Sequence, residues 1–414
     1  MTKRDIDNIR STLTRRGALG LSAATLLAVN ASRTGFAQAA SVDSGFSKDG
    51  QVGFPSIVRS NEASEGNAEG PLPANERVGF AVVALGRLSV EQILPAFGQA
   101  KKSRLAALVS GSRDKLTVLG RQYGVRPEAL LGYDELERLR EIEDVKVVYV
   151  VLPNSMHKEY VLRSAAIGKH VLCEKPMATN SEDARAMIDA CSTAGVKLMI
   201  AYRCRYQPHH LEVIRRAQSG DLGPVKLIDS INGQNQGDPE QWRLRRAMAG
   251  GGSLPDVGIY CLNAARAITG EEPVEIEARI NSPAGDPRFR EVEESVAWIL
   301  RFPSGAMANL SSSYGIHRAS RLAVHLDGGN LLLDNAYLYK GQRLTVRHAI
   351  EGRETETLVE VPAKDHFALE LDHMAECVLT GRQPNTPGEE GLRDMNLMEA
   401  IYRSADQRTV VRMD

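Results

Sequence analysis

The sequence predicts an α/β protein: an N-terminal doubly wound parallel (Rossmann) sheet followed by a C-terminal α+β domain built on a largely antiparallel open sheet. Residues 77–201 alternate short, continuous apolar runs with helical patterns, which is typical of parallel strands covered on both faces. In residues 202–414, strand-like runs follow one another across short Gly, Pro and Asp turns, which favours antiparallel pairing. We therefore expect a nucleotide-binding domain followed by a substrate and oligomerisation domain.

The individual elements follow from the same patterns. In the first domain we expect strands at 78–85, 103–111, 144–153, 169–175 and 196–202, with helices after Gly86, at 114–124, and from about 155 and 181. In the second domain we expect strands at 225–233, 273–280, 294–302, 306–314 and 321–334. A helix at 256–269 interrupts these strands, and helices near 368–379 and 389–403 close the chain.

Composition limits the classes of function. The chain has 414 residues, 43% apolar content and a net charge of -1, which suits two globular domains with cores of their own. Lys and Arg are interspersed with acids, so there is no positive stripe to attract nucleic acid, and the expected ligand is a small molecule. The five cysteines show no C-x-x-C spacing, so we expect buried free thiols rather than a metal site or a disulfide framework; they are Cys173, Cys191, Cys204, Cys261 and Cys377.

The first 39 residues read as a twin-arginine signal peptide. Arg15 and Arg16 precede an apolar run, and Ala37-Gln38-Ala39 has the small-x-small form of a cleavage site. This predicts recognition by the twin-arginine export machinery and a periplasmic protein. A stable membrane anchor is the alternative, but the apolar run is shorter than the ~20 residues that span a bilayer. Residues 40–76 are rich in Gly, Ser, Asn and Pro, and we expect a flexible arm that either docks on another subunit or serves as a linker.

The turn after the first predicted strand carries a weak dinucleotide fingerprint. Ala84 and Ser89 stand where the usual pattern has glycines, and only the middle one, Gly86, is present. That glycine is the one that lets the backbone approach a pyrophosphate. We expect Gly86, Arg87 and Leu88 to contact the cofactor.

The end of the second predicted strand favours NADP over NAD. Ser110, Gly111, Arg113 and Lys115 occupy the region where an acidic residue would bind the ribose hydroxyls of NAD. Hydroxyls and cations suit a 2′-phosphate instead. The alternative is that both cations are merely solvated residues at the start of a helix.

Two later strand ends lie at the same edge of the predicted sheet. Pro153, Asn154 and His157 follow one strand, and Glu174 and Lys175 end the next, so all five are candidate cofactor contacts. An ammonium at 175 could also bond a sugar hydroxyl and lower the pKa of a neighbouring phenol. His157 is equally well explained as an exposed histidine on a helix.

Asp256 and Tyr260 lie four residues apart at the start of a predicted helix. Side chains at this spacing share one helix face, so both can point at a single bound molecule. A free phenol titrates near pH ~10, so Tyr260 can move protons at neutral pH only if a cation stabilises its phenolate. We predict a redox site with Lys175, Asp256 and Tyr260 as catalytic residues and no metal.

Four segments, ERVGFAVVALG, VLCEKPMAT, LMIAYRCRYQP and QWRLRRAMAGGGSLPDVGIY, resemble the Gfo/Idh/MocA oxidoreductases. The resemblance runs from about Arg77 to the C-terminus and is closest to the periplasmic glucose-fructose branch, which has tyrosine where many members have histidine at 260. It implies that Lys175, Asp256 and Tyr260 surround the reacting sugar carbon. It also implies cofactor contacts from Tyr133, Arg203, Trp242, Arg243 and Tyr339. On the residues alone, Trp242 reads as a core anchor and Arg243 as a surface cation.

The resemblance implies a ping-pong cycle with tightly bound NADP. An aldose would pass hydride from C1 to the cofactor and leave as the lactone, and a second carbonyl sugar would take the hydride and leave as the alditol. The alternatives are an ordinary NADP-dependent aldose dehydrogenase, an aldose-aldose oxidoreductase, and a non-catalytic sugar or nucleotide sensor. By analogy we also expect a homo-oligomer, either a dimer or a tetramer. Ala84, the distinct arm and the lack of a long tail after Asp414 depart from the branch, which leaves cofactor geometry, oligomeric contacts and permanent cofactor binding open.

Overall fold

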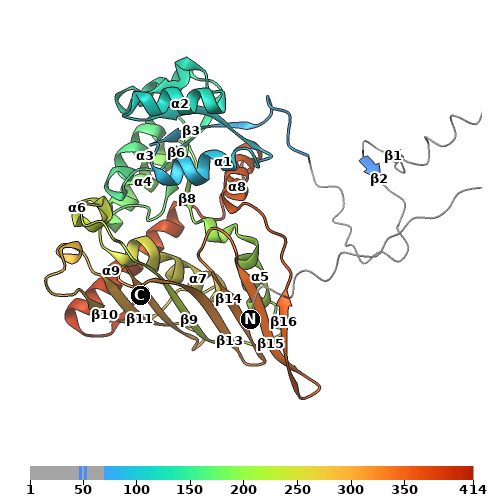
Figure 1. Ribbon diagram of the computed structural model, residues 1–414, viewed down its shortest axis with the longest axis vertical. Helices are drawn as coiled ribbons and strands as arrows, with labels where there is room; N and C mark the ends of the chain where they lie inside the picture. Colours follow the sequence, from blue (N-terminus) through green and yellow to red (C-terminus); the bar gives the residue numbers. More distant parts are fainter. Residues whose placement is uncertain (1–45, 49–50, 54–69, 414) are drawn as a thin grey trace, which may run out of the picture. The chain divides into compact units, whose positions relative to one another are not determined.

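The computed structural model describes residues 46–48, 51–53 and 70–413 (Figure 1). The chain divides into two compact units, residues 1–69 and 70–414. In the first unit, β1 (Phe46–Lys48) and β2 (Gln51–Gly53) pair as an antiparallel hairpin. The predicted signal peptide lies outside the described residues. No helix in the described part of the chain is long and apolar enough to cross a membrane.

The second unit begins with a six-stranded sheet in the order β5-β4-β3-β6-β7-β8, with every pair parallel. This is the order of a doubly wound Rossmann sheet, with the switch point between β3 and β6. The strands are β3 (Val78–Val83), β4 (Ser103–Val109), β5 (Leu130–Leu131), β6 (Val145–Val150), β7 (His170–Glu174) and β8 (Leu198–Ala201). The predicted parallel sheet is confirmed, and the two-residue edge strand β5 is an addition.

Helices cover this sheet because nearly every strand residue is buried and needs an apolar partner on both faces. They are α1 (Leu94–Ala96), preceded by a π-helical turn at Ser89–Ile93, then α2 (Arg113–Tyr123), α3 (His157–Ala166) and α4 (Ser181–Thr193). All four lie where helices were expected. One further helix, α8 (His366–Thr380), comes from the C-terminal part of the chain and contacts β3 and β4.

The second sheet has nine strands in the order β16-β15-β14-β13-β9-β12-β11-β10-β17. Only β9 and β12 pair in parallel, so the predicted, largely antiparallel sheet is confirmed. The strands are β9 (Val225–Gln234), β10 (Glu275–Asn281), β11 (Ser295–Arg301), β12 (Met307–Ser313), β13 (Arg318–Leu326), β14 (Gly329–Asp334), β15 (Arg343–Ile350), β16 (Arg353–Val359) and β17 (Val411–Arg412).

Helices cover one face of this larger sheet (Figure 1). The helix α5 (Pro208–Gln218) contacts β14 and β15. The helix α7 (Ile259–Thr269) contacts β9 and β12, and α9 (Gly388–Gln407) contacts β10. A short helix, α6 (Arg246–Ala249), lies outside this layer and contacts the turn at Asn154–Met156. Burial alternates along β11, with Trp298 and Leu300 inside and Ala297 and Ile299 exposed. The far face of the sheet is therefore open within the described part of the chain.

A buried ion cluster joins α7 to α9. Arg266 is 4% exposed, and its guanidinium contacts the carboxylates of Asp394 and Glu390, which are 0% and 7% exposed. The same guanidinium reaches Glu272 at 2.6 Å. The cluster fixes α7, and with it the residues at its N-terminus, against the last long helix of the chain.

We predict that Arg266→Leu lowers the free energy of unfolding by about 3–5 kcal/mol, because it leaves the fully buried Asp394 without its cation, whereas Glu390 keeps Arg205 and Arg393. Chemical denaturation measures the change. Arg215→Leu is the matched control, because Arg215 is 58% exposed and its partner Glu212 keeps a second ion pair with Arg216. The control should change stability by less than about 1 kcal/mol. Equal effects of the two changes would contradict a structural role for the cluster.

Candidate active site

The turn that follows β3 has an unusual backbone. Ala84 adopts φ 79°, a left-handed conformation that favours glycine, so alanine stands in the conformation of the glycine it replaces. Two residues later, a Cβ built on Gly86 would meet no atom within 4 Å. The open space beside Gly86 fits the close approach of a dinucleotide pyrophosphate. Arg87 next to it is exposed and pairs with Glu91 at 3.0 Å.

The end of β4 is tied to that turn by a lysine. The Lys115 ammonium donates to the carbonyl oxygen of Leu85 at 3.1 Å, and the Ser110 hydroxyl accepts the backbone N–H of Ser112 at 3.2 Å. Arg113 is exposed and pairs with Glu135 at 2.8 Å. The predicted cations Arg113 and Lys115 therefore lie beside the turns that follow β3 and β4. This is where groups that bind the phosphate on the adenosine of NADP are expected.

The Tyr133 ring lies directly over Gly111. A Cβ at Gly111 would come within 3.1 Å of that ring, and Tyr133 packs edge-on against Tyr160 with centroids 5.7 Å apart. The predicted contacts at 111 and 133 thus lie against each other, and a side chain at Gly111 would require the Tyr133 ring to move by a few tenths of an ångström.

His157 lies inside the fold rather than at its edge. The side chain is 0% exposed, and its ring nitrogens lie 3.0 Å from the Pro176 carbonyl oxygen and 2.8 Å from that of Leu152. It therefore supports the turn after Lys175, and this geometry offers no ring atom to a cofactor. Asn154 is also turned inward and donates to the carbonyl oxygen of Ala249 at 2.9 Å.

Glu174, likewise a predicted cofactor contact, is buried beneath the site. Its Oε1 accepts the Tyr149 hydroxyl at 2.7 Å, and its Oε2 accepts the backbone N–H of Lys175 at 3.2 Å. Its carboxyl group faces the protein interior. This position suits a counter-charge below the site better than a direct contact with the cofactor.

Lys175, Asp256 and Tyr260 come together as expected. The Lys175 ammonium donates to the backbone oxygen of Asp256 at 2.7 Å and to its Oδ1 at 3.4 Å. It also lies 4.7 Å from the centroid of the Tyr260 ring. The expected single helix differs in detail, because Asp256 belongs to a π-helical turn (Leu254–Gly258) and Tyr260 to the first turn of α7. The wider turn still places both side chains beside Lys175.

Asp256 is held by three side chains. Besides Lys175, its Oδ2 accepts the hydroxyl of Tyr314 at 2.7 Å and lies 3.3 Å from Nε of Arg243. Burial would raise the pKa of this carboxyl, but Lys175 and Arg243 outweigh it and hold the pKa below its ordinary value. Asp256 is therefore ionised at neutral pH. Arg243 in turn stacks on Trp242, with Cζ 4.5 Å from the ring centroid.

Tyr314 was not predicted from the sequence. It follows β12 and lies 58 residues from Asp256, and it is 0% exposed. No local spacing links the two positions. Only the serines that precede it on a predicted strand mark the segment as unusually polar for a core element.

Arg203, predicted as a cofactor contact, lies against Tyr260. It is 5% exposed, its Nε donates to the Tyr260 hydroxyl at 3.1 Å, and its Cζ lies 4.6 Å from that ring. Its NH2 group donates to the carbonyl oxygen of Tyr337 at 2.6 Å. Tyr339 is 45% exposed and covers the guanidinium, with its centroid 4.9 Å from Cζ.

The pKa of Tyr260 is raised, which the sequence did not lead us to expect. Burial raises it more than the neighbouring Arg203 lowers it, and the charges of Glu174 and Asp256 raise it further. The neutral phenol is therefore the stable form in the protein alone. A further positive charge beside the ring is needed before the phenolate forms readily.

All five cysteines are buried and free, as predicted. Within residues 46–48, 51–53 and 70–413, no group of three His, Cys, Asp or Glu side chains could hold a metal ion.

We predict that Asp256→Asn destabilises the protein at neutral pH and that the difference shrinks in acid. The folded-state pKa of Asp256 lies below its ordinary value of 3.8, so its contribution is complete above that value and is lost as pH falls through the lowered pKa. Denaturation of both proteins from pH ~7 to ~3 measures this. A difference that grew as the pH fell would contradict an ionised Asp256.

Comparison with known proteins places the fold in a family. Residues 78–202 match the model "Oxidoreductase family, NAD-binding Rossmann fold", and residues 210–332 match "GFO/IDH/MocA C-terminal domain". D-xylose 1-dehydrogenase [NADP(+)] of Haloarcula marismortui is 30% identical over 347 residues, which covers 81% of this chain and 93% of that protein. Inositol 2-dehydrogenase of Rhizobium meliloti is 26% identical over 325 residues, covering 73% and 93%.

Among solved structures, aldose-aldose oxidoreductase from Caulobacter crescentus, complexed with glycerol, is 44% identical with a TM-score of 0.79, covering 81% of this chain and all of that one. Levoglucosan dehydrogenase shares the fold at 18% identity and a TM-score of 0.72. The matched domains cover most of the chain in the expected order. The protein therefore belongs to the Gfo/Idh/MocA oxidoreductase family.

Proposed function

We propose that this oxidoreductase uses NADP to transfer hydride to and from sugars and that Tyr260 is its acid-base residue. The observation that carries the proposal is the position of the Tyr260 ring between two cations, with Lys175 at 4.7 Å and Arg203 at 4.6 Å from its centroid. Cations at this range offset part of the burial penalty on the phenolate that proton abstraction from a sugar hydroxyl requires, and the positive charge of an oxidised nicotinamide would add to them. A sensor would have no need of such an arrangement.

The residues around Tyr260 divide the work. The Lys175 ammonium donates hydrogen bonds to the backbone and side-chain oxygens of Asp256. Because an ammonium has three N–H donors, one remains for a substrate oxygen. Asp256 fixes the lysine and is itself fixed by Tyr314 and Arg243. Arg203 stabilises the charge that develops on the Tyr260 oxygen. Because the resting phenol is neutral, it is ready to donate a proton in the direction of sugar reduction.

NADP is the cofactor that suits both the chain and its relatives. The open space at Gly86 and the cations Arg113 and Lys115 beside the first two turns fit a dinucleotide with a 2′-phosphate. Bound NADP would accept the hydride and return it. The similar D-xylose 1-dehydrogenase is NADP-dependent by name.

The cycle we propose is of the glucose-fructose type, in which tightly bound NADP is reduced by an aldose and reoxidised by a second carbonyl sugar. The 44% identity to an aldose-aldose oxidoreductase supports a second candidate, in which the acceptor is another aldose. Adding glucose to the purified protein, followed by fructose or a second aldose, separates them by which acceptor removes the absorbance of reduced nicotinamide. A need for added NADP would favour a simple aldose dehydrogenase.

We expect Tyr260→Phe to bind NADP as the wild type does and to lose turnover by about 10²-fold or more, because the variant keeps the ring but not the hydroxyl. Stopped-flow absorbance of cofactor reduction by an aldose measures the loss, and cofactor titration checks binding. Tyr339→Phe is the control, since its partly exposed hydroxyl is outside the proton step. Activity retained by the Tyr260 variant would rule out this assignment.

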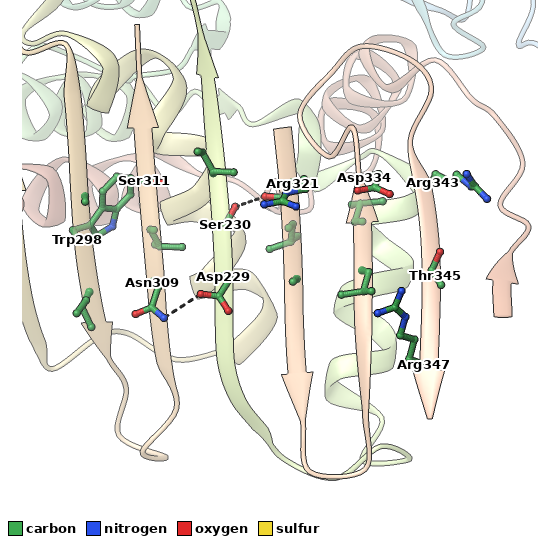
Figure 2. A pocket seen from close by; sticks show the side chains of 18 of the residues that line it. Asp229, Ser230, Trp298, Asn309, Ser311, Arg321, Asp334, Arg343, Thr345 and Arg347 are labelled. Atoms are coloured by element: carbon green, nitrogen blue, oxygen red, sulfur yellow. Dashed lines mark hydrogen bonds between the residues drawn. The ribbon is translucent and has the colours of Figure 1, made fainter. Parts of the chain in front are cut away.

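We also propose that the protein forms a homo-oligomer through the open face of the nine-stranded sheet (Figure 2). Strands β9 to β15 form a concavity of about 940 Å³ there, with the Asn309 amide bonded to Asp229 at 3.0 Å in its floor. Ile299 and Met307 on this face are 44% and 45% exposed. Apolar residues among mixed charges suit contact with a second copy.

Ile299→Asp should lower the oligomeric state without lowering thermal stability by more than a few degrees, because the side chain lies outside the core. Sedimentation measures the mass. Val118→Asp on α2, whose side chain is 63% exposed, is the control and should leave the mass unchanged. A wild-type monomer would contradict the proposal.

The signal-like sequence leads us to propose export to the periplasm by the twin-arginine machinery. Cell fractionation tests this: replacing both Arg15 and Arg16 by lysine should leave the protein inside the cell. Unchanged distribution would contradict it.

A further inference from the structure

A group of buried acids lies beneath Tyr260 and has no part in the hydride chemistry. It consists of Tyr149 on β6, Glu174 at the end of β7 and Glu370 on α8, with exposed fractions of 1%, 7% and 1%. Two carboxylates this close in a poorly solvated place do not both ionise readily. The group therefore needs a proton, and the geometry indicates which carboxyl carries it.

Glu174 has the partners of a charged group. It accepts hydrogen bonds from the Tyr149 hydroxyl at 2.7 Å and from the backbone N–H of Lys175 at 3.2 Å. Burial raises the pKa of Glu174, but these hydrogen bonds and the charges of Lys175 and Arg203 oppose that rise. Glu370 lacks such support, since its buried Oε1 has no hydrogen-bond partner. The negative charge accordingly belongs on Glu174.

The hydrogen bond of the Tyr149 hydroxyl also indicates that Glu174 is charged and Glu370 is neutral. Its single hydrogen is given to Glu174, so it offers only an oxygen lone pair to Glu370, the other carboxyl that it faces. A carboxylate at 370 would meet that lone pair without a hydrogen between them, whereas a protonated acid can donate to it. Burial and the charge of Glu174 also raise the pKa of Glu370 well above its ordinary value.

The charge on Glu370 bears on Tyr260 through Arg203. The guanidinium donates to the Tyr260 hydroxyl at 3.1 Å and also acts electrostatically on Glu370. Cys204 likewise faces Glu370, and His366, one turn earlier on α8, is neutral because burial and Arg203 lower its pKa to about 2. Arg203 thus acts on both Tyr260 and Glu370, and a second carboxylate would compete for it.

We propose that Glu370 is held as the neutral acid beneath Arg203 and that its neutrality leaves the Arg203 charge available to the phenolate of Tyr260. Glu370 touches neither substrate nor cofactor in this scheme, so it is a positioning residue. The inference rests on the proposed role of Tyr260 as the acid-base residue. It deepens that role by naming what spares the cation beside the phenol a second buried carboxylate in addition to Glu174.

Infrared spectroscopy of the full-length holoenzyme tests the protonation state directly. The spectrum of the wild type minus that of Glu370→Gln should contain the carbonyl stretch of a protonated carboxylic acid, which shifts in D2O. Glu376→Gln on the same helix is the control and should give no such band, because Glu376 is partly exposed and paired with Lys102 at 2.9 Å. Absence of the band from the Glu370 difference spectrum would overturn the proposal.

The coupling to Tyr260 has its own readout. When an aldose reduces the bound cofactor, the wild-type difference spectrum should include a change in the Glu370 band that is missing in Glu370→Gln. A Glu370 that served only packing would give no such signal, and that result would overturn the proposal. If Glu370→Gln fails to fold, Tyr149→Phe should move the same band, because it removes the oxygen that accepts the acid proton.

Kinetics completes the test. Glutamine is neutral at every pH, so the Glu370→Gln enzyme should keep a rate of cofactor reduction within about twofold of the wild type at neutral pH. A tenfold loss of that rate would show that a charge at 370 is required, and it would overturn the proposal. The two proposals fail separately. If no aldose reduces the cofactor in the wild type, the proposed function fails, while the static infrared band still decides the state of Glu370.

Discussion

The site depends on one buried cation placed against one phenol. Arg203 is almost fully covered, and a guanidinium so placed must be balanced by fixed groups because water cannot solvate it. The Tyr260 hydroxyl, the Tyr337 carbonyl and the Tyr339 ring occupy three sides of it. Its charge offsets part of the penalty that burial imposes on a phenolate at Tyr260.

The arrangement is possible because the two sheets meet at this point in the chain. Arg203 lies directly after β8, the last strand of the parallel sheet, and Tyr260 opens α7 on the larger sheet. Lys175 spans from the parallel sheet to the backbone of Asp256. Both cations beside the phenol therefore follow strands of the parallel sheet, whereas the phenol itself lies on a helix of the larger sheet, which the ion cluster around Arg266 ties to α9.

The sequence was informative where function is encoded locally. Lys175, Asp256 and Tyr260 lie in short segments with recognisable spacing, and the alternation of apolar strands with helices identified the parallel sheet. It was less informative where partners come from distant segments: Tyr314 and Tyr149 contact site residues only through the fold. His157 was assigned to the cofactor from its position after a strand end and Arg203 from the family resemblance, and neither source says which way a side chain turns.

Strands β15 and β16 were missed for a different reason. β16 forms one edge of the large sheet and alternates Arg, Glu and Thr on an exposed surface, so the apolar periodicity that marks a half-buried strand is absent from it. β15 lies between β14 and β16 and does alternate, but only Leu344 and Val346 are buried along it, which is a short signal. Ala84 shows the opposite case. A departure from the glycine pattern weakened the sequence argument, yet the backbone takes the glycine conformation all the same.

The return of α8 to the parallel sheet has a consequence for how the chain reaches its folded state. This helix is made after the whole of the larger sheet except β17, yet it contacts β3 and β4 near the start of the second unit. Until it arrives, the face of the Rossmann sheet that holds Tyr149 and Glu174 lacks a cover. The nucleotide-binding half is thus complete only when synthesis is nearly finished, and a fragment ending near residue 201 would present that polar, unmatched surface to solvent. The two sheets are separate in architecture, but the parallel sheet needs a helix from the C-terminal part of the chain before its fold is complete.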